Sequence, residues 1–404
     1  MKPDRRLIAL LVALAVAVLP QQRAASAATP RTTTGHHIVP LHVASVPLSP
    51  AAFTVPASNV AFASPVLDEH HVVYAVAWPR MYTLPHKHDP TCATCGGAQS
   101  TAFHMQIYIR LFQSGSGGIV VSQPRLLFTG PRGAQVAFMA FHHGWLIYET
   151  YLVGDRWALF ARNVVSGRQI LLDSPRQEGM PSRFVQAGSD GSTVVWQGWR
   201  RMGGTVVSAI RSYSLLTGQR RLLLSGGTGQ DFFYGSPAVS GDRLVYERGV
   251  PDGTAQLFLE IMATGRTRAL TPLHQLNGEA AIAGNVVVWV HGSLAIGHNT
   301  HGLVVLNLAN GHRLALTHSP AQLPRIAAGR YVVFGTVDTH TSVQSYDTRT
   351  HQRRTLTAGR PLVGPGSSDG QVEAGGHVVL YSLLTVCGGV SFPCPERFVL
   401  VALP

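Results

Sequence analysis

The stretch PAVSGDRLVY (237–246) decides the fold, because close variants of it recur along the chain, AAIAGNVVVW at 280–289 and PRIAAGRYVVF at 324–334. Each variant has a run of small residues, a tight turn, and an apolar strand that ends on an aromatic residue. Glycine and asparagine in these turns supply the positive φ that tight hairpins require. The repeated unit is therefore predicted to be a β-hairpin.

The aromatic end of this hairpin, preceded by two apolar residues, occurs seven times. These anchor residues are Tyr74, Tyr148, Trp196, Tyr246, Trp289, Phe334 and Tyr381. They are separated by 74, 48, 50, 43, 45 and 47 residues, so every interval except the first is close to one period. A second hairpin follows most anchors, as in NLANGHRLALT at 307–317. The chain is thus built from repeats of two hairpins each.

Four short strands in each repeat of roughly 45 residues predict an all-β fold, a seven-bladed β-propeller of four-stranded antiparallel blades. A sandwich of two stacked sheets is the alternative, but it gives no reason for seven copies of one anchor. After Tyr381 the last repeat has room for one further clear strand, ERFVLVALP. We therefore expect an N-terminal strand, HIVPLHVASV at 37–46, to close the ring by pairing two open sheet edges, with 47–57 as its connector.

The N-terminal segment has the features of a secretory signal peptide. Basic residues precede an apolar run at 7–19, and the small residues at 25–27 match a cleavage site. The predicted organisation is a signal peptide at 1–27, a closing strand and connector at 28–57, and the propeller at 58–404. No stretch reaches the roughly 20 apolar residues of a membrane-spanning helix. We expect an exported protein, secreted or periplasmic, without a transmembrane segment.

The chain is basic, with a formal net charge of +12. Residues 1–27 hold four basic side chains and one aspartate, so the charge without them falls by 3 to +9. Arginine supplies nearly all of it, and the arginines are scattered among hairpins instead of forming one run. We interpret this as a solvated basic surface that favours acidic partners, without specific nucleic-acid binding.

The repeat resembles the TolB-like family of exported propellers, whose blades end in an Arg-Leu-Thr strand. The matching stretches are RALT at 268–271, RLALT at 313–317 and RTLT at 354–357. The Trp-Ser-Pro-Asp-Gly turn of that family is replaced here, for example by VSGD at 239–242. The resemblance covers about residues 58 to 404 and implies the propeller fold. Members of such families bind proteins, peptides or glycans, and some related propellers are enzymes.

Sequence motifs of several catalytic classes are absent from the chain. It lacks the GxSxG elbow, the HExxH zinc motif and a P-loop. Glu149 and Glu247 directly follow anchor residues, and side chains alternate along a strand. Their carboxylates are therefore expected in a polar layer between blades, where structural hydrogen bonding is favoured over catalysis. We expect no metal and no cofactor.

One face of the propeller is the expected binding surface, formed by the loops between blades and between the two middle strands. The expected ligand-binding residues on it are Arg176, Glu178, Asp231, Phe232, Phe233, Tyr234, His274, Glu279 and Arg360. The aromatic run at 232–234 beside Asp231 suits a sugar or peptide, because rings stack and a carboxylate accepts hydrogen bonds. The alternative is that these rings pack over the entrance of the blade.

Four cysteines fall in two equivalent loops, Cys92 and Cys95 after the first anchor, and Cys387 and Cys394 after the last. The first and last blades are neighbours in a closed ring, so all four are expected on one face at the closing seam. In an exported chain they are expected to form two disulfides, either across the seam or within each loop. A zinc site with nearby histidines and redox chemistry of the CxxC motif are the alternatives.

The sequence therefore predicts a monomeric exported binding module that contacts a protein or glycan through its loop face. The alternative is an extracellular carbohydrate lyase or hydrolase that uses carboxylates and histidines of that face. The propeller fold alone does not choose between the two.

Overall fold

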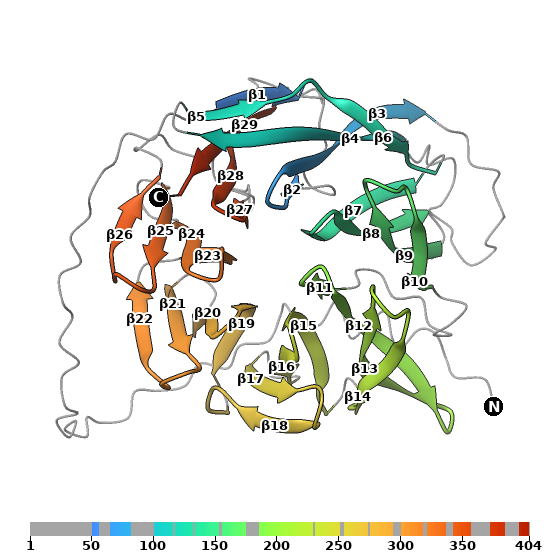
Figure 1. The fold of residues 1–404 in the computed structure, drawn as a ribbon. Helices are drawn as coiled ribbons and strands as arrows, with labels where there is room; N and C mark the ends of the chain where they lie inside the picture. Colours follow the sequence, from blue (N-terminus) through green and yellow to red (C-terminus); the bar gives the residue numbers. More distant parts are fainter. Residues whose placement is uncertain are drawn as a thin grey trace, which may run out of the picture. The chain divides into compact units, whose positions relative to one another are not determined.

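The computed structural model describes residues 51–55, 65–81, 101–115, 118–131, 134–152, 156–174, 186–228, 231–250, 254–273, 275–293, 300–317, 321–336, 342–356, 372–383 and 396–403. These residues form seven antiparallel sheets in a ring, a seven-bladed β-propeller (Figure 1). The innermost strands of successive sheets contact one another in cyclic order, and the first sheet contacts the last. The predicted fold is confirmed.

The first four blades follow one another along the chain. Blade 1 consists of β2 (Val66–Leu67), β3 (His71–Met81), β4 (Thr101–Gly115) and β6 (Arg125–Thr129), with β5 (Gly118–Val121) paired to the end of β4. Blade 2 consists of β7 (Ala134–His142), β8 (Trp145–Leu152), β9 (Arg156–Asn163) and β10 (Gln169–Asp173). Blade 3 consists of β11 (Ala187–Ser189), β12 (Thr193–Met202), β13 (Thr205–Ser214) and β14 (Arg220–Gly226). Blade 4 consists of β15 (Phe233–Ser240), β16 (Arg243–Gly249), β17 (Ala255–Ile261) and β18 (Arg266–Ala269).

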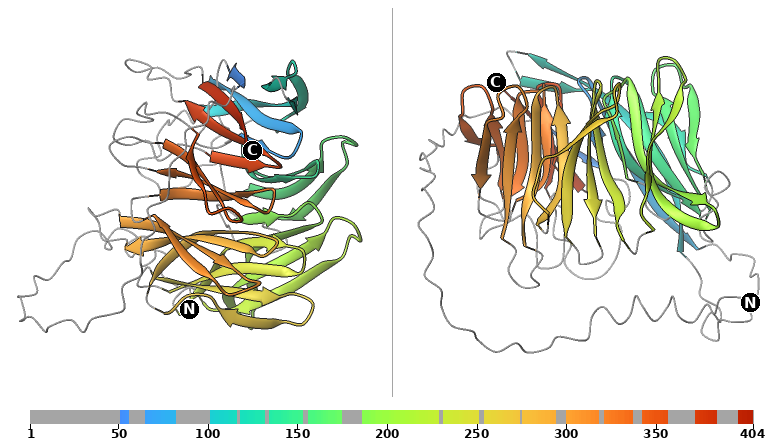
Figure 2. Two further views of the ribbon diagram at one scale, coloured as in Figure 1. Left: turned by 60° about the vertical axis from the view of Figure 1, so that its left-hand side comes forward. Right: turned by 90° about the horizontal axis from the view of Figure 1, so that it is seen from below.

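The remaining blades complete the ring. Blade 5 consists of β19 (Leu276–Ala283), β20 (Val286–Ser293), β21 (Thr300–Asn307) and β22 (Arg313–Thr317). Blade 6 consists of β23 (Ala321–Ala327), β24 (Tyr331–Thr336), β25 (Ser342–Asp347) and β26 (Arg353–Thr355). Blade 7 consists of β27 (Val372–Gly375), β28 (Val378–Leu383), β29 (Glu396–Ala402) and β1 (Ala51–Val55). Figure 2 shows the blades edge-on, with their strands running side by side.

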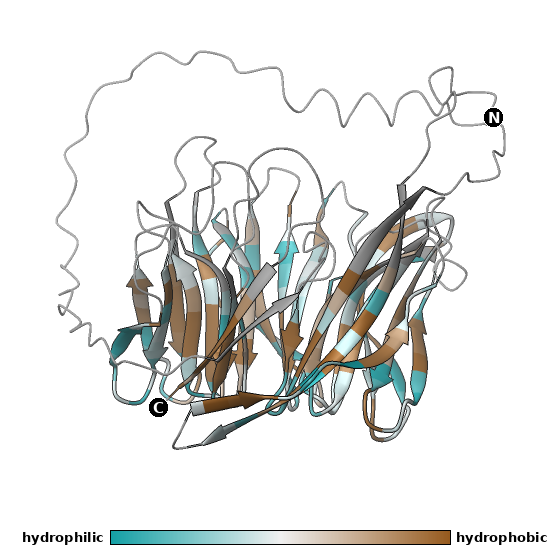
Figure 3. Ribbon diagram, turned by 90° about the horizontal axis from the view of Figure 1, so that it is seen from above, coloured by the Kyte–Doolittle hydropathy of each residue, from teal (hydrophilic) through white to brown (hydrophobic). Residues whose placement is uncertain are grey.

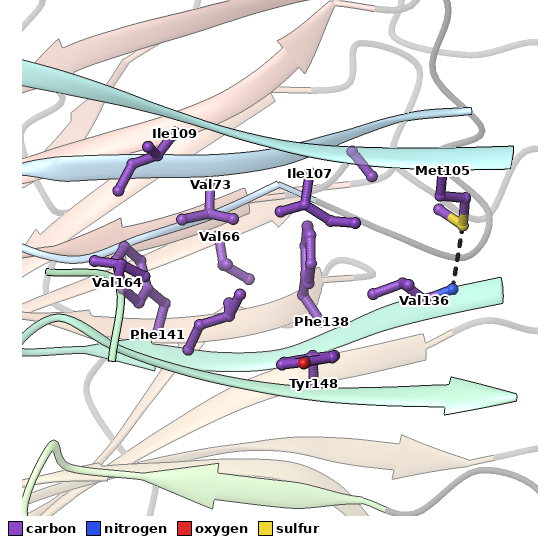
Figure 4. Packing of buried hydrophobic residues seen from close by; sticks show 12 residues of the cluster. Val66, Val73, Met105, Ile107, Ile109, Val136, Phe138, Phe141, Tyr148 and Val164 are labelled. Carbon is purple, nitrogen blue, oxygen red and sulfur yellow. Dashed lines mark hydrogen bonds between the residues drawn. The ribbon is translucent and has the colours of Figure 1, made fainter. Parts of the chain in front are cut away.

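All seven anchor residues lie in the second strand of their blade and are at most 6% exposed. Because side chains alternate along a strand, each blade presents apolar residues to both of its neighbours. The core is therefore a set of clusters between blades, such as the one where Val73 and Ile107 of blade 1 meet Val136 and Tyr148 of blade 2 (Figure 4). Hydrophobic residues run along the strands, and hydrophilic residues mark many of the turns (Figure 3).

The turns between first and second strands are hydrogen-bonded from blade to blade. Six residues before the anchor, Asp68 Oδ2 accepts a bond from the Gly144 N–H at 2.9 Å, and Asp190 Oδ2 accepts one from the Gly241 N–H at 2.8 Å. Ser240 holds the same place in blade 4, and its Oγ accepts a bond from the N–H of Gly284 at 2.9 Å. One repeat position thus links neighbouring blades on the face opposite the loop face.

The ring is closed by an N-terminal strand, but not by the stretch expected from the sequence. β1 pairs antiparallel with β29, from Ala51 opposite Leu400 to Val55 opposite Glu396. This strand lies in 47–57, which was predicted to be a connector, and 37–46 lies outside the described residues. Apolarity and β-propensity fit both segments, so the local sequence did not determine which of them pairs with β29.

A second element covers the same seam. β4 continues beyond its pairing with β3 and turns back through β5, which contacts both β1 and β29. Phe112 and Ile119 of this hairpin are buried in one cluster with Leu380 and Phe398 of blade 7. Part of the long interval between the first two anchors is therefore this hairpin, whereas the sequence placed the excess in the loop with Cys92 and Cys95.

Several arginines of the outer strands join neighbouring blades. Their guanidinium groups donate hydrogen bonds to backbone carbonyls at the end of the preceding blade, in the pairs Arg220 with Leu171, Arg313 with Leu270 and Arg353 with Leu316. Arg313 also lies over the Trp289 ring, 5.2 Å from its centroid, and Arg353 lies over Phe334 at 5.4 Å. Part of the basic charge of the chain thus stabilises the contacts between blades.

Glu260 is a buried carboxyl group in the contact between blades 3 and 4. It is 4% exposed, and its Oε2 has no hydrogen-bond partner among the described residues. By the alternation of β17, its side chain lies on the same side as Phe258, which stacks on Tyr246. Burial raises the pKa of Glu260, because a carboxylate loses hydration in this apolar layer.

We expect Glu260→Gln to stabilise the protein increasingly as the pH rises. With the folded pKa above the unfolded value of about 4.5, the folded state binds the proton more tightly, so the wild type loses stability as the pH rises through that interval. Urea unfolding of both proteins across this range measures the difference. A difference that does not change with pH contradicts the expectation, and Asp242→Asn, at an exposed turn, controls for removal of one charge.

In the part of the chain that the structure describes, no helix has the length and apolar character needed to cross a membrane. Within the same residues, no group of three or more histidine, cysteine, aspartate or glutamate side chains is arranged to hold a metal ion.

Candidate functional site

The structure describes part of the loop face, and five of the nine expected ligand-binding residues lie in that part. Asp231, Phe232, Phe233, Tyr234 and Glu279 lie in the described residues. The other four expected ligand-binding residues, Arg176, Glu178, His274 and Arg360, lie outside them. All four cysteines, Cys92, Cys95, Cys387 and Cys394, also lie outside the described residues, so their pairing stays a prediction.

The aromatic run at 232–234 begins an aromatic ladder in blade 4. The Phe232 and Tyr234 rings meet edge to face with centroids 5.3 Å apart, and Tyr234 meets Tyr246 in the same way at 5.6 Å. Tyr246 then stacks on Phe258 at 5.5 Å. The loop-face end of this ladder is therefore held by rings that reach the buried anchor residue.

Arg248 covers the loop-face end of the ladder. Its Cζ lies 4.0 Å from the centroid of the Phe232 ring, and its side chain is exposed. This is a cation–π contact at short distance, with Phe232 itself half-buried. An exposed guanidinium group is thus fixed on an aromatic base. We call Asp231, Phe232 and Arg248 the blade 4 platform.

Two glycines allow the platform to pack closely. Gly227 has φ 73, and a Cβ there would lie 2.3 Å from the Phe232 carbonyl oxygen. A Cβ on Gly249 would lie 2.3 Å from the Phe233 ring. The packing interpretation of the aromatic run thus applies to Phe233 and Tyr234, whereas Phe232 also supports an exposed charged group.

The loop that carries the platform is tied to blade 3. Ser208 Oγ accepts a hydrogen bond from the Tyr234 N–H at 2.9 Å, and Thr228 Oγ1 donates one to Asp231 Oδ2 at 3.3 Å. Asp231 is exposed, beside a half-buried ring. The platform therefore offers a carboxylate, an aromatic face and a guanidinium group in one short stretch of surface.

A second polar group lies on the first and second strands of neighbouring blades. The Glu279 N–H donates to Glu247 Oε1 at 3.0 Å, which links blades 4 and 5. Burial raises the pKa of Glu247, and the nearby Glu279 carboxylate acts in the same direction. Glu279 is exposed and lies within β19, although the sequence placed it in a loop. Glu149, the equivalent of Glu247 in blade 2, is fully buried.

Bulges in the inner strands position this group. The register shifts between Gly235 and Ala238 and again between Gly278 and Ala281, and Ser236 and Glu279 have φ of 44 and 50 within these shifts. A bulge re-aims a side chain out of the regular alternation. Gln186 Oε1 accepts a hydrogen bond from the Ser236 N–H at 2.6 Å, which extends the group to blade 3.

An ion pair continues the inner polar group across blades 6 and 7. Arg325 Nη2 lies 2.9 Å from Glu373 Oε1, and Arg325 Nε lies 3.1 Å from Glu373 Oε2, a bidentate geometry. We call Gln186, Glu247, Glu279, Arg325 and Glu373 the inner polar group. Its members come from five successive blades.

Sequence reasoning missed Arg248, Arg325 and Glu373, together with a second loop-face side chain, His291. His291 Nδ1 lies 3.0 Å from Oδ1 of the buried Asn277, and burial lowers its pKa. Arg248 and His291 both lie two residues after an anchor. Alignment of the repeats places both side chains at the loop-face end of a second strand, but this position is Val76, Gly198 and Leu383 in three other blades, so the repeat pattern alone does not mark it as functional.

The fold and these loop-face groups define a β-propeller protein with a polar and aromatic surface on one face. No protein-family model and no curated protein matches the chain, so no model assigns it to the TolB-like family. A prolyl endopeptidase structure is similar with a TM-score of 0.53 and 12% identity, over 84% of this chain and 48% of that chain. This chain therefore spans about half of the length of that enzyme.

Other solved structures are similar at lower TM-scores. TolB from Acinetobacter baumannii has a TM-score of 0.42 and 16% identity, over 62% of this chain and 58% of that chain. An oligogalacturonate lyase in complex with manganese has a TM-score of 0.49 and 11% identity, over 89% of this chain and 98% of that chain. At these identities the likenesses concern the fold alone.

Proposed function

We propose that this chain is an exported binding module that contacts a protein or glycan ligand through its loop face, at the blade 4 platform. The observation that carries the proposal is the position of the exposed Arg248 guanidinium group, 4.0 Å over the Phe232 ring. Export rests on the secretory features of residues 1–27.

A fixed arginine on an aromatic base suits recognition. Binding surfaces concentrate their affinity in a few rigid aromatic and arginine side chains. Phe232 is held by the ladder beneath it, so little conformational entropy is lost when a ligand stacks against it. Arg248 offers hydrogen bonds to a carboxylate or phosphate of the ligand, and Asp231 accepts bonds from its hydroxyl or amino groups.

The inner polar group supports a second candidate, a carbohydrate lyase or hydrolase. Glu247 and Glu279 come from neighbouring blades, and burial raises the pKa of Glu247 while Glu279 is exposed. Two carboxyl groups in different environments divide the roles of general acid and general base. Turnover of uronate-containing and neutral polysaccharides by the wild type, lost in Glu247→Gln, is the result that would favour this candidate.

We expect Phe232→Ala combined with Arg248→Ala to weaken ligand binding by about tenfold or more, because both parts of a central contact are removed. Ligands are first selected with the wild type from a peptide display library and a glycan array, and affinities are then measured by calorimetry. Arg266→Ala is the matched control, since Arg266 is an exposed arginine on the outer strand of the same blade. Equal affinity of the double variant and the wild type would contradict the proposal.

A further inference from the structure

Exposed large apolar side chains are unevenly distributed around the ring. Nine such residues are found in the described part of the chain, and eight of them lie on blades 1 to 3. Five of these form what we call the apolar rim: Leu126, Leu171 and Leu222 on the outer strands, 41–48% exposed, and Val165 and Leu216 at turn tips, 79% and 81% exposed. Single exposed leucines need no explanation, but a half-ring of them does.

The propeller fold does not require these side chains. The three rim leucines are equivalent, because each pairs with the third-strand residue that lies opposite the anchor of its blade. Blades 4 to 6 carry Ala269, Ala315 and Thr355 at that position. The two turn tips are likewise equivalent to Ala263 and Ala309 of blades 4 and 5. At these equivalent positions, the large apolar side chains are thus found in blades 1 to 3 and are replaced by smaller ones in the described part of blades 4 to 6.

Arginines link the outer parts of the blades that carry the apolar rim and give this region a positive charge. Arg220 Nη2 donates to the Leu171 carbonyl at 3.0 Å, which holds the outer strands of blades 2 and 3 side by side. Arg162 lies over Phe128 of blade 1 at 4.9 Å and donates to Gln169 Oε1 at 3.0 Å, which joins blades 1 and 2. The exposed arginines beside the rim residues are Arg125, Arg168, Arg220 and Arg221.

Among the described residues of blades 1 to 3 that follow β3, no exposed acidic side chain offsets this positive charge. The acidic residues described between 101 and 228 are Glu149 and Asp173, both buried, and Asp190, whose carboxylate is used in an inner turn. The surface thus carries aliphatic and guanidinium groups without a described exposed carboxylate on it. A partner that fits this surface is anionic and takes up protruding aliphatic chains.

We propose that the apolar rim is a docking surface for an anionic lipid bilayer. Val165 and Leu216 protrude at turn tips on the outer part of the ring, and a fluid bilayer takes up such side chains without a matching concave surface. The arginines then lie at the level of the headgroups, where they attract anionic phosphates. This combination of insertion and charge gives reversible attachment, separate from ligand binding at the blade 4 platform.

The test is sedimentation of the exported chain, which lacks residues 1–27, with vesicles of phosphatidylcholine alone and of phosphatidylcholine mixed with phosphatidylglycerol. We expect binding to the mixed vesicles only, weakened by added salt because the arginine contribution is screened. We expect Val165→Glu with Leu216→Glu to reduce binding about tenfold or more, since two inserted chains are lost and two negative charges approach the anionic surface.

The matched control places the same charges on the other half of the ring. Ala263→Glu with Ala309→Glu has the same net charge at equivalent turn tips and is expected to bind the mixed vesicles as the wild type does. Equal losses in both double variants, or no binding of the wild type to mixed vesicles, would overturn the proposal. Soluble polyglutamate is added as a competitor of the mixed vesicles. If the protein binds polyglutamate as well as it binds the vesicles, the lipid proposal is overturned in favour of an acidic polymer as the partner. The double variant Phe232→Ala with Arg248→Ala is expected to bind vesicles as the wild type does. Failure of the ligand proposal can therefore be told apart from failure of the lipid proposal.

Discussion

Replacing Asp173 by alanine is expected to lower the free energy of unfolding by about 3–5 kcal/mol, because it leaves buried polar partners without their carboxylate. Asp173 ends the outer strand of blade 2 and is 1% exposed. Its Oδ2 accepts hydrogen bonds from Trp196 Nε1 at 2.7 Å and from Arg211 Nη1 at 3.0 Å, both in blade 3. The carboxylate therefore joins two blades at the anchor residue of the second.

Urea unfolding followed by tryptophan fluorescence measures this loss. Asp173→Asn keeps the size of the side chain and one acceptor oxygen, so it is expected to lose less stability than Asp173→Ala. Asp242→Ala removes an exposed carboxylate and is expected to leave stability nearly unchanged. If Asp173→Ala unfolds at the same urea concentration as Asp242→Ala, the contact between blades 2 and 3 does not depend on this carboxylate.

The sequence of the repeat indicates that this contact is specific to blades 2 and 3. In blades 4 and 5 the position equivalent to Asp173 is threonine, Thr271 and Thr317, the last residue of the Arg-Leu-Thr strand. Thr271 Oγ1 accepts a hydrogen bond from the Leu257 N–H of its own blade at 3.0 Å. A charged residue in this place departs from the pattern, and the departure coincides with a partner, Arg211, in the next blade.

The fold could be predicted because the information for each blade is local. An alternating strand that ends on a buried aromatic residue repeats in sequence, and every copy was found in the second strand. The inner polar group could not be predicted in this way. Arg325 and Glu373 are 48 residues apart and meet only because the ring places the inner strands of blades 6 and 7 together. Glu279 reaches its position through a bulge, which the alternation of the strand does not reveal.

The blade 4 platform could be predicted in part from the sequence. The composition of the run from Phe232 to Tyr234 predicts a binding surface, but Arg248, which completes the platform, lies 16 residues after Phe232, on the next strand. Its place over Phe232 depends on the pairing of β15 with β16, in which Tyr234 lies opposite Arg248. Register between strands, and not local sequence, makes the contact.

Removing β1 is expected to destabilise the ring, whereas removing only the residues that precede β1 is not. A variant that lacks residues 1–55 loses the five residue pairs between β1 and β29, and with them several backbone hydrogen bonds of about 0.5–1.5 kcal/mol each. The edge of β29 is then open in a blade of three strands, and open edges pair with other chains. We expect a loss of about 3 kcal/mol or more together with concentration-dependent aggregation.

A variant that lacks only residues 1–50 is the matched control, because it keeps β1. We expect it to unfold at the urea concentration of the longer chain and to stay monomeric in light scattering, whereas the variant without 1–55 unfolds earlier. The β4–β5 hairpin limits the damage, since Phe112 still packs against Phe398 across the seam. Combining the truncation with Phe112→Ala removes both closing elements. A double change that costs no more than the truncation alone would show that the hairpin plays no part in closing the ring.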